Sequence, residues 1–334
     1  MALKILVTGA DGFIGSHLVE SLVVKGFKVK AFVYYNSQNS WGWLDHVDKK
    51  IIDNLEVFPG DIRDYECVES AVKNVDIIFN LASLIGIPYS YKAPGSYIDT
   101  NIKGIINIMN ASRKYKIRKI IHTSTSEVYG SAKFLPMNEN HPLNAQSPYA
   151  ASKIGSDQLA LSYFCSFDTP ISIIRPFNTY GPRQSLRAII PTIICQMLDK
   201  NCNAIKLGNL EVTRDFNYIT DTVSGFISTI KAKKILGEVI NIGNGYQISI
   251  NELIKTISEI LGYKKKVIIQ EARVRNKKTE VRKLCASNIK AKKILKWSPE
   301  YKSKKGLILG LKKTIDWYKK KENLQKFKSN LYNI

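Results

Sequence analysis

Short apolar runs alternate with amphipathic segments over the first half of the chain. The runs predict strands at residues 3–7, 28–33, 55–58, 76–81, 119–122 and 171–175. Strands that are apolar nearly throughout are typical of a parallel sheet that is buried on both faces. Between them, apolar residues recur at helical spacing, as at Ile14, Leu18 and Leu22, and indicate helices near 96–114 and 149–165. The pattern predicts an α/β fold of Rossmann type, a doubly wound parallel sheet with helices on both faces.

The regular alternation ends at about Pro176. Beyond it the pattern predicts a helix at 189–198, strands at 204–207 and 214–218, a helix from Asp221, a strand at 239–242 and a helix at 250–261. We therefore expect two parts. Residues 1–176 form a dinucleotide-binding domain that also carries the catalytic residues. Residues 177–325 form mainly a smaller α/β substrate-binding domain, with some crossing of the chain between the two.

A glycine-rich turn joins the first strand to the first helix. Three glycines have the G-x-x-G-x-x-G spacing that opens a dinucleotide-binding βαβ unit. The first allows a tight turn, the second lets the backbone approach a pyrophosphate, and the third lets the helix pack on the strand. Amides at the helix N-terminus would then face the phosphates. The segment predicts cofactor contacts from Gly9, Asp11, Gly12, Phe13, Ile14 and Gly15.

The end of the second strand commonly distinguishes NAD from NADP. An Asp at that position accepts from the ribose 2′-hydroxyl, whereas an Arg binds the 2′-phosphate. This chain has Val33-Tyr34-Tyr35-Asn36, with neither residue. NAD is favoured because no basic residue stands locally in the sequence, and NADP stays an alternative.

Two further strand ends supply cofactor candidates. After the third strand, Asp61 is expected to meet the adenine amino group and Ile62 the ring, with an N-cap of the next helix as the competing role of Asp61. Leu81, Ala82 and Ser83 follow the fourth strand. Ligands bind at the carboxyl ends of strands in doubly wound sheets, so these residues are expected beside the cofactor.

Composition excludes several classes of protein. The 334 residues are 44% hydrophobic and 23% charged, which is ordinary for a globular enzyme. No apolar run reaches the ~20 residues that span a bilayer, and the first residues do not resemble a signal peptide. The five cysteines and four histidines form no metal-ligand spacing. We expect a cytoplasmic protein with neither a metal nor a membrane partner.

The formal net charge of +22 raises the question of nucleic-acid binding. Lysine is spread along the whole chain, and no aromatic-interleaved basic motif or zinc finger accompanies it. We therefore interpret the charge as solvated surface and expect no nucleic-acid partner. A positive field also suits a diphosphate ligand.

The chemistry is expected between Thr123 and Lys153. Tyr149 and Lys153 stand four residues apart on a predicted helix, so the ammonium can lie beside the phenol. A neighbouring cation favours the phenolate. With Thr125 or Ser124 supplying a hydroxyl near the substrate oxygen, the pair makes a proton shuttle for alcohol–ketone interconversion.

Four motifs together resemble the extended short-chain dehydrogenase/reductases that act on nucleotide sugars. They are the glycine turn 9–15, the segment 123–130, Tyr149-x-x-x-Lys153 and the segment 175–184. Within that family, Ser124-Thr125-Ser126-Glu127 is similar to the 4,6-dehydratase signature. Segments 31–44, 183–192 and 207–215 resemble the dehydratases of legionaminic acid synthesis, whose substrate is GDP-N-acetylglucosamine.

The resemblance implies a role for each residue of the catalytic stretch. Tyr149 takes the proton of the sugar O4, Lys153 tunes it and holds the nicotinamide ribose, and Thr125 hydrogen-bonds O4. Glu127 removes the proton from C5. Water leaves from C6 and a 4-keto-6-deoxy sugar forms, so NAD stays tightly bound and is recycled. Ser126 stands where glucose-type dehydratases keep an Asp as the acid, which leaves the acid open between Glu127 and a water.

The resemblance also implies a nucleotide-diphospho-sugar site and a homodimer. Asn178, Arg214 and Arg275 fall where the family grips the diphosphate, and Glu280 where it meets nucleotide hydroxyls; Arg183 is a further substrate-binding candidate. The dimer is expected to form through the helices 96–114 and 149–165.

Three alternatives remain at this point. A UDP-glucuronate decarboxylase of the same family needs a cation for the substrate carboxylate. A nucleotide-sugar 4-epimerase needs no carboxylate at position 127, so Glu127 counts against it. A cofactor-bound regulatory protein has no use for a tuned phenol at Tyr149.

Overall fold

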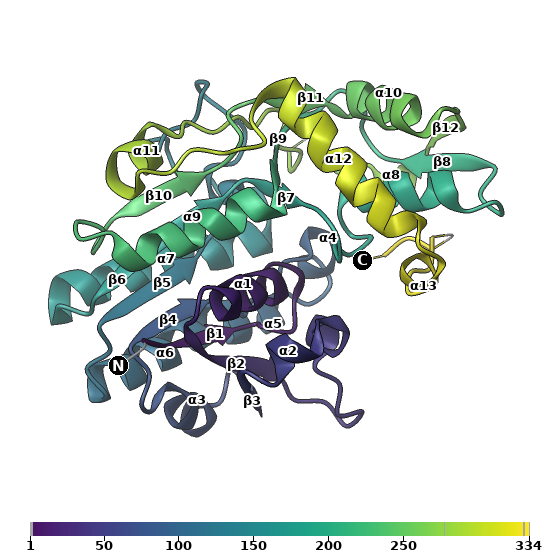
Figure 1. The fold of residues 1–334 in the computed structure, drawn as a ribbon. Coiled ribbons are helices and arrows are strands. Elements are labelled where there is room, and N and C mark those ends of the chain that lie inside the picture. Colours follow the sequence, from purple (N-terminus) through teal and green to yellow (C-terminus); the bar gives the residue numbers. More distant parts are fainter. Residues whose placement is uncertain (1–2, 277, 330, 334) are drawn as a thin grey trace.

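The computed structural model describes residues 3–276, 278–329 and 331–333. Its main feature is a sheet of seven parallel strands in the order β10-β6-β5-β4-β1-β2-β3 (Figure 1). The strands are β1 (Lys4–Thr8), β2 (Lys28–Tyr34), β3 (Leu55–Gly60), β4 (Ile77–Asn80), β5 (Lys119–Thr123), β6 (Ile171–Pro176) and β10 (Val239–Ile242). Each strand predicted in the first half is present, and the doubly wound α/β fold is confirmed.

Helices cover both faces of this sheet, because neighbouring residues of a strand point to opposite sides. In β1, Ile5 and Val7 share a buried cluster with residues of α1 (Phe13–Val24) and α9 (Ile219–Lys231). Leu6 instead belongs to the cluster formed with α3 (Tyr65–Val72), α6 (Gly104–Lys114) and α7 (Pro148–Phe167). Burial on both faces explains why the strands are apolar nearly throughout.

The strand order reverses between β1 and β4. From β1 the chain continues outward to β2 and β3, and it then crosses back to β4 and continues to β5 and β6. In doubly wound sheets the crevice outside the carboxyl ends of the strands at such a reversal binds ligands. The glycine turn after β1 and the residues after β4 and β5 meet at this point.

The second half of the chain forms two small sheets with their own helices, gathered at one end of the large sheet (Figure 1). One sheet contains β7 (Asn178–Tyr180), β9 (Thr213–Tyr218) and β11 (Gln247–Ser249); the other pairs β8 (Ala204–Leu207) with β12 (Lys266–Ile269). The helices are α8 (Ile189–Leu198), α10 (Ile250–Leu261), α12 (Ser303–Lys319) and α13 (Lys321–Leu324). Three elements of the second half, α9, β10 and α11 (Ile289–Leu295), belong to the large sheet or its covering layer; β10 pairs with β6, and α9 packs beside α1.

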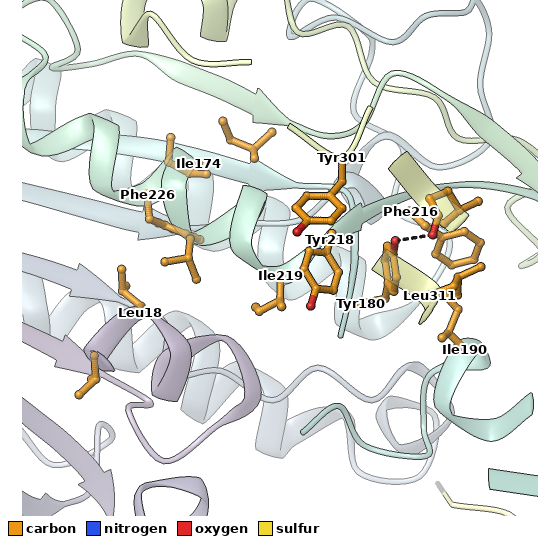
Figure 2. Packing of buried hydrophobic residues seen from close by; sticks show 14 of the residues in the cluster. Leu18, Ile174, Tyr180, Ile190, Phe216, Tyr218, Ile219, Phe226, Tyr301 and Leu311 are labelled. Carbon is orange, nitrogen blue, oxygen red and sulfur yellow. Dashed lines mark hydrogen bonds between the residues drawn. The ribbon is translucent and has the colours of Figure 1, made fainter. Parts of the chain in front are cut away.

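Aromatic side chains fill the interior where the second half meets the sheet (Figure 2). The ring of Tyr218 lies with its centroid 4.5 Å from that of Tyr301 and 5.5 Å from that of Tyr180. The hydroxyl of Tyr180 donates to the carbonyl of Leu307 at 3.1 Å. The buried phenol therefore has a hydrogen-bond partner, and this bond connects α12 to β7 of the three-stranded sheet.

The helix predicted at 96–114 is present, but it is not α-helical throughout. The structure has α5 (Pro94–Tyr97), a π-helical segment (Ile98–Lys103) and then α6. Asn101 lies in the π-helical segment and is buried. Its amide oxygen accepts from the Ser83 hydroxyl at 2.8 Å, and its amide nitrogen donates to the Ser152 hydroxyl at 2.9 Å. The wider turn thus connects the loop after β4 to α7, a long-range requirement that local periodicity does not encode.

Several elements were not predicted. They are mostly short, such as α2 (Lys49–Ile52), α4 (Ile87–Ser90), β7, β11 and β12. The longest omission is α12, in which Leu307, Leu311, Ile315 and Tyr318 are buried at helical spacing. The lysines between them obscured this pattern. Along the described residues, no helix combines the length and apolar character needed to cross a membrane.

Candidate active site

A cleft of about 1220 Å³ lies outside the carboxyl ends of β1, β4 and β5. This exceeds the ~300–1,000 Å³ of a typical small-molecule pocket, so it has room for two ligands side by side. Every residue for which the sequence predicted a role lines it: Gly9, Asp11, Gly12, Phe13, Ile14, Gly15, Asp61, Ile62, Leu81, Ala82, Ser83, Thr125, Ser126, Glu127, Tyr149, Lys153, Asn178, Arg183, Arg214, Arg275 and Glu280. Their common location is a finding, whereas their individual roles stay predictions.

The glycine turn has the shape that a dinucleotide requires. Gly9 has a φ of +66°, and a Cβ on it would lie 2.9 Å from the amide nitrogen of Ala82. A Cβ on Gly15 would lie 2.0 Å from the carbonyl oxygen of Gly9. The N-cap of α1 is Gly12, which offers no side-chain hydrogen bond to the first amides of the helix. These amides face the cleft and can bind an anion, so the residues fit the pyrophosphate of a dinucleotide.

Lys153 is held in place by the end of β5. The helix α7 begins with Ser147 as its N-cap, whose hydroxyl accepts from the amide of Ala150 at 3.1 Å. Lys153 follows in the next turn, is buried, and donates from Nζ to the carbonyl of Thr123 at 2.6 Å. Burial lowers the pKa of Lys153 to about 8, although the carboxylate of Asp157 opposes the shift. The ammonium form therefore predominates at neutral pH.

Tyr149 is also buried, and its pKa is raised above the ordinary value. The main cause is burial; a hydrogen bond with Thr125 opposes it, and the negative charge of Glu127 adds to it. Burial is the larger influence on the phenol in this structure, and the expectation that Lys153 favours the phenolate stays a prediction. The hydrogen bond from Thr125 agrees with the expectation that this hydroxyl shares a site with the phenol.

A buried polar network lies behind the catalytic stretch and was missed from the sequence. The hydroxyl of Ser124 donates to Asp157 at 2.7 Å, and Arg175 donates to the same carboxylate oxygen from Nη2 at 2.9 Å. A further guanidinium nitrogen of Arg175 donates to the Tyr129 hydroxyl at 3.0 Å. Ser124 is thus committed to Asp157, which leaves Thr125 as the hydroxyl for the substrate. No local signal marks the network, since its members come from distant segments.

Glu127 lines the same cleft as Tyr149 and Arg214. A short 3-10 helix (Ser126–Tyr129) follows β5, and the hydroxyl of Thr125 caps it by accepting from the Glu127 amide at 3.2 Å. Ser126 is buried and Glu127 half-buried. The negative charge of Glu127 is one of the causes that raise the pKa of Tyr149, and it also opposes the lowering of the pKa of Arg214. The carboxylate is therefore within electrostatic reach of both the phenol and the guanidinium.

The predicted substrate residues differ in how they are held. Arg214 is buried, and Nη2 lies 3.5 Å from a carboxylate oxygen of Glu280. Burial lowers its pKa, and the charge of Arg275 acts in the same direction. The negative charge of a bound phosphate would oppose this lowering by stabilising the charged guanidinium. Among the described residues the buried Oδ1 of Asn178 has no hydrogen-bond partner; as an acceptor it can receive a ligand N–H or O–H, whereas a diphosphate oxygen would need the amide nitrogen.

Arg183 is already engaged within the protein. Its Nη1 and Nη2 donate to the two carboxylate oxygens of Glu20 in α1, at 2.7 Å and 2.9 Å. The bidentate pair joins the second half of the chain to the helix that follows the glycine turn. This contact gives Arg183 a structural role in addition to its position in the cleft.

Asp61 likewise has a partner that the sequence argument did not foresee. Both of its carboxylate oxygens accept from Nε of Arg63 at 3.0 Å. The N-cap of α3 is Asp64, whose carboxylate accepts from the amide of Cys67 at 2.7 Å. The competing prediction that Asp61 caps this helix is therefore wrong.

The C-terminal segment also lines the cleft, through Lys326, Tyr332 and Asn333. The guanidinium of Arg273 lies 4.5 Å from the ring centroid of Tyr332. Trp43, from the polar-aromatic loop after β2, has its ring centroid 5.7 Å from that of Trp317 in α12. None of these contacts could be inferred from the sequence, because the C-terminal segment shows no periodicity that indicates its position.

No group of three or more His, Cys, Asp or Glu side chains within the described ranges is arranged to hold a metal ion. The glycine turn and the cations Arg214 and Arg275 line the same cleft.

Comparison with known proteins agrees with this arrangement. Residues 6–308 match the family model for GDP-mannose 4,6 dehydratase. The chain is 36% identical over 276 residues to dTDP-D-glucose 4,6-dehydratase of Dictyostelium discoideum, covering 77% of this chain and 62% of the relative. It is 31% identical over 335 residues to UDP-glucuronate 4-epimerase of Thermodesulfobacterium geofontis, covering 97% and 98%. The structure of dTDP-glucose 4,6-dehydratase from Bacillus anthracis in complex with NAD superposes with a TM-score of 0.83 at 30% identity, covering 96% of this chain and 98% of that one.

Proposed function

This chain belongs to the GDP-mannose 4,6 dehydratase family, in which nucleotide-sugar dehydratases stand beside epimerases and decarboxylases, and we propose that it is an NAD-dependent nucleotide-sugar 4,6-dehydratase. The observation that carries the proposal is the carboxylate of Glu127, half-buried in the cleft and within electrostatic reach of Tyr149. Dehydration across C5 and C6 needs a base beyond the one that acts at O4. Glu127 is suited to that second role.

The residues of the cleft divide the reaction among them. Bound NAD would supply the acceptor for the hydrogen that leaves C4 and the donor for the hydrogen that enters C6. Tyr149 takes the O4 proton, Thr125 holds O4 by hydrogen bonding, and the Lys153 ammonium offsets the charge of the phenolate. The C4 ketone acidifies the C5–H bond. Glu127 then removes the C5 proton and gives it to the C6 hydroxyl, which leaves as water. Return of hydrogen to C6 from bound NAD would be accompanied by addition of a solvent-derived proton at C5. The C4 ketone is retained, so Tyr149 releases the O4 proton to solvent.

The charge of Glu127 favours dehydration over decarboxylation. A decarboxylase has to bind a substrate carboxylate with a cation. Arg214, the predicted diphosphate ligand, is already paired with Glu280. A carboxylate on C5 of the sugar would lie next to Glu127, if that residue acts at C5, and the two negative charges would repel each other, whereas a neutral C6 hydroxymethyl group would not be repelled. A 4-epimerase stays the second candidate, and it would leave Glu127 without a chemical role.

We further propose GDP-N-acetylglucosamine as the substrate and the formation of a precursor of a bacterial nonulosonic acid glycan, on the resemblance of segments 31–44, 183–192 and 207–215. The proposal includes a cytoplasmic homodimer. Much of the apolar surface of α6 packs inside the protomer, because Ile105, Ile108 and Met109 are buried. Ile98 is 49% exposed and is available for the partner subunit.

A panel of GDP- and UDP-sugars, with product masses measured after incubation with the purified protein, tests the proposal. Loss of water from GDP-N-acetylglucosamine supports it. Loss of carbon dioxide from a uronic acid would identify a decarboxylase, and a change of configuration without a change of mass would identify an epimerase. No reaction with any sugar would favour a regulatory cofactor-binding protein.

The proposal also predicts that the cofactor is not consumed. Oxidation at C4 and reduction at C6 cancel, so one bound NAD serves many turnovers. Acid denaturation should release the dinucleotide from purified protein, and product should form without stoichiometric addition of NAD. A requirement for one added NAD per product would contradict this part of the account.

A further inference from the structure

A guanidinium lies at the end of β2, although β2 itself ends without a basic residue. The neighbouring strand β3 pairs with β2 in a register that aligns Tyr34 with Gly60. The amide of Tyr35 also donates to the carbonyl of Gly60 at 3.1 Å. Arg63, three residues beyond Gly60, lies within electrostatic reach of Tyr34, and both side chains line the cleft. In a dinucleotide fold this is the position at which the adenosine ribose is read.

The guanidinium of Arg63 forms a hydrogen-bonded ion pair with the carboxylate of Asp61. Its Nε is 3.0 Å from each carboxylate oxygen of Asp61, and Nη2 also donates to that carboxylate. The Asp61 carboxylate further accepts from the backbone amide of Arg63 at 2.9 Å. These charge-assisted bonds hold Nε and Nη2 on the carboxylate, and the negative charge of Asp61 offsets the positive charge of the guanidinium.

The other charged groups around the pair leave no net positive charge. The charge of Asp99 contributes to raising the pKa of Arg63, and the charge of Lys103 contributes to lowering the pKa of Asp61. Two cations thus stand beside two carboxylates. A ribose hydroxyl fits such a neutral group, whereas a 2′-phosphate brings roughly two negative charges that nothing there balances.

We infer that the pair of Asp61 and Arg63 makes this site select NAD over NADP, with Asp61 acting by withholding Arg63 from a 2′-phosphate. The inference rests on the proposed dinucleotide-dependent function and deepens it. Removal of the Asp61 charge frees a guanidinium at the ribose position. Because the pair is partly exposed, with 43% of the Arg63 side chain accessible, the selectivity should weaken at high ionic strength.

A competition experiment measures this selectivity without any turnover. The protein is equilibrated with equal concentrations of NAD and NADP in excess, freed of unbound dinucleotide by gel filtration, and denatured with acid. The released NAD and NADP are then quantified. Their ratio cancels any loss of the adenine contact that the Asp61 substitution causes equally for both ligands.

Wild-type protein should retain predominantly NAD. Asp61→Asn should shift the NADP:NAD ratio by about tenfold or more toward NADP, as expected for one charge-assisted contact. The double variant Asp61→Asn/Arg63→Ala should return to the wild-type ratio. The matched control Asp64→Asn removes a carboxylate from the same loop that caps α3 and does not contact Arg63, so it should leave the ratio unchanged.

Three results would overturn the inference. One is equal retention of NAD and NADP by the wild type. Another is an unchanged ratio in Asp61→Asn, provided that its circular dichroism and melting temperature match those of the wild type. The third is a shift toward NADP that persists in the double variant. In each of these cases bound dinucleotide is still present and the proposed function stands, whereas absence of both dinucleotides from the wild type would remove the proposed function as well.

Discussion

Glu127→Gln is the substitution that separates oxidation from elimination in this site. It keeps the size of the side chain and its ability to hydrogen-bond, and it removes only the base. General-base assistance contributes ~10²–10⁴-fold, or about 3–5 kcal/mol at ~1.36 kcal/mol per tenfold. Because the charge of Glu127 acts upward on the pKa of Tyr149, its removal should not hinder proton transfer from O4. The variant should therefore reduce bound cofactor normally and fail at the next step.

Two observables follow these two steps. Ultraviolet absorbance reports reduced nicotinamide, and proton NMR in deuterated water reports exchange at C5 of the sugar. Glu127→Gln should show the absorbance without the exchange, whereas Tyr149→Phe should show neither. Glu280→Gln is the matched control, since it removes the other carboxylate that faces Arg214. It should raise KM and retain C5 exchange at saturating substrate. Exchange and product release by Glu127→Gln within a fewfold of wild type would refute the role of this base.

Three other predictions concern pH, stability and assembly. The pKa of Lys153 is about 8, so activity that needs its ammonium should be present below that pH and should fall as the pH rises through it. A kcat/KM profile that stays flat to pH ~10 would exclude a role for the Lys153 ammonium in the reaction. Arg175→Met should lower the unfolding free energy by about 3–5 kcal/mol in urea titrations, because it strands the buried carboxylate of Asp157, and Arg175→Met/Asp157→Leu should recover most of the loss. Analytical ultracentrifugation should show a dimer at micromolar concentration, and a monomer alone would contradict assembly through α6 and α7.

Local signals in the sequence were sufficient for most of the sheet and for the cofactor loop. A strand that is buried on both faces is apolar throughout, and the glycine turn after β1 has a recognisable spacing, although Gly9 packs against the distant Ala82. The spacing of Tyr149 and Lys153 follows from helix geometry alone. These features leave a local pattern of residue types, so periodicity and spacing reveal them.

The features that the sequence did not reveal depend on contacts between distant segments. Arg63 reaches the end of β2 only because β3 pairs with β2 in one register. The raised pKa of Tyr149 depends on how deeply its phenol is buried. The hydrogen bond that the Ser124 hydroxyl donates depends on Asp157, which lies on α7 and is 33 positions further along the chain. The C-terminal wall of the cleft, including Tyr332, requires the whole second half to be in place. The sequence shows which residue types are present, but which of them contact each other becomes known only from the folded structure.

The most direct test of the central claim follows one hydrogen atom. GDP-N-acetylglucosamine carrying deuterium at C4 is incubated with the wild-type protein in ordinary water, and the product is analysed by mass spectrometry and NMR. The account predicts a product that has lost water, carries the deuterium at C6, and has a C5 hydrogen derived from the solvent. A product of unchanged mass that retains the deuterium at C4 would identify an epimerase and would contradict the assignment of Glu127 as the base of a dehydration.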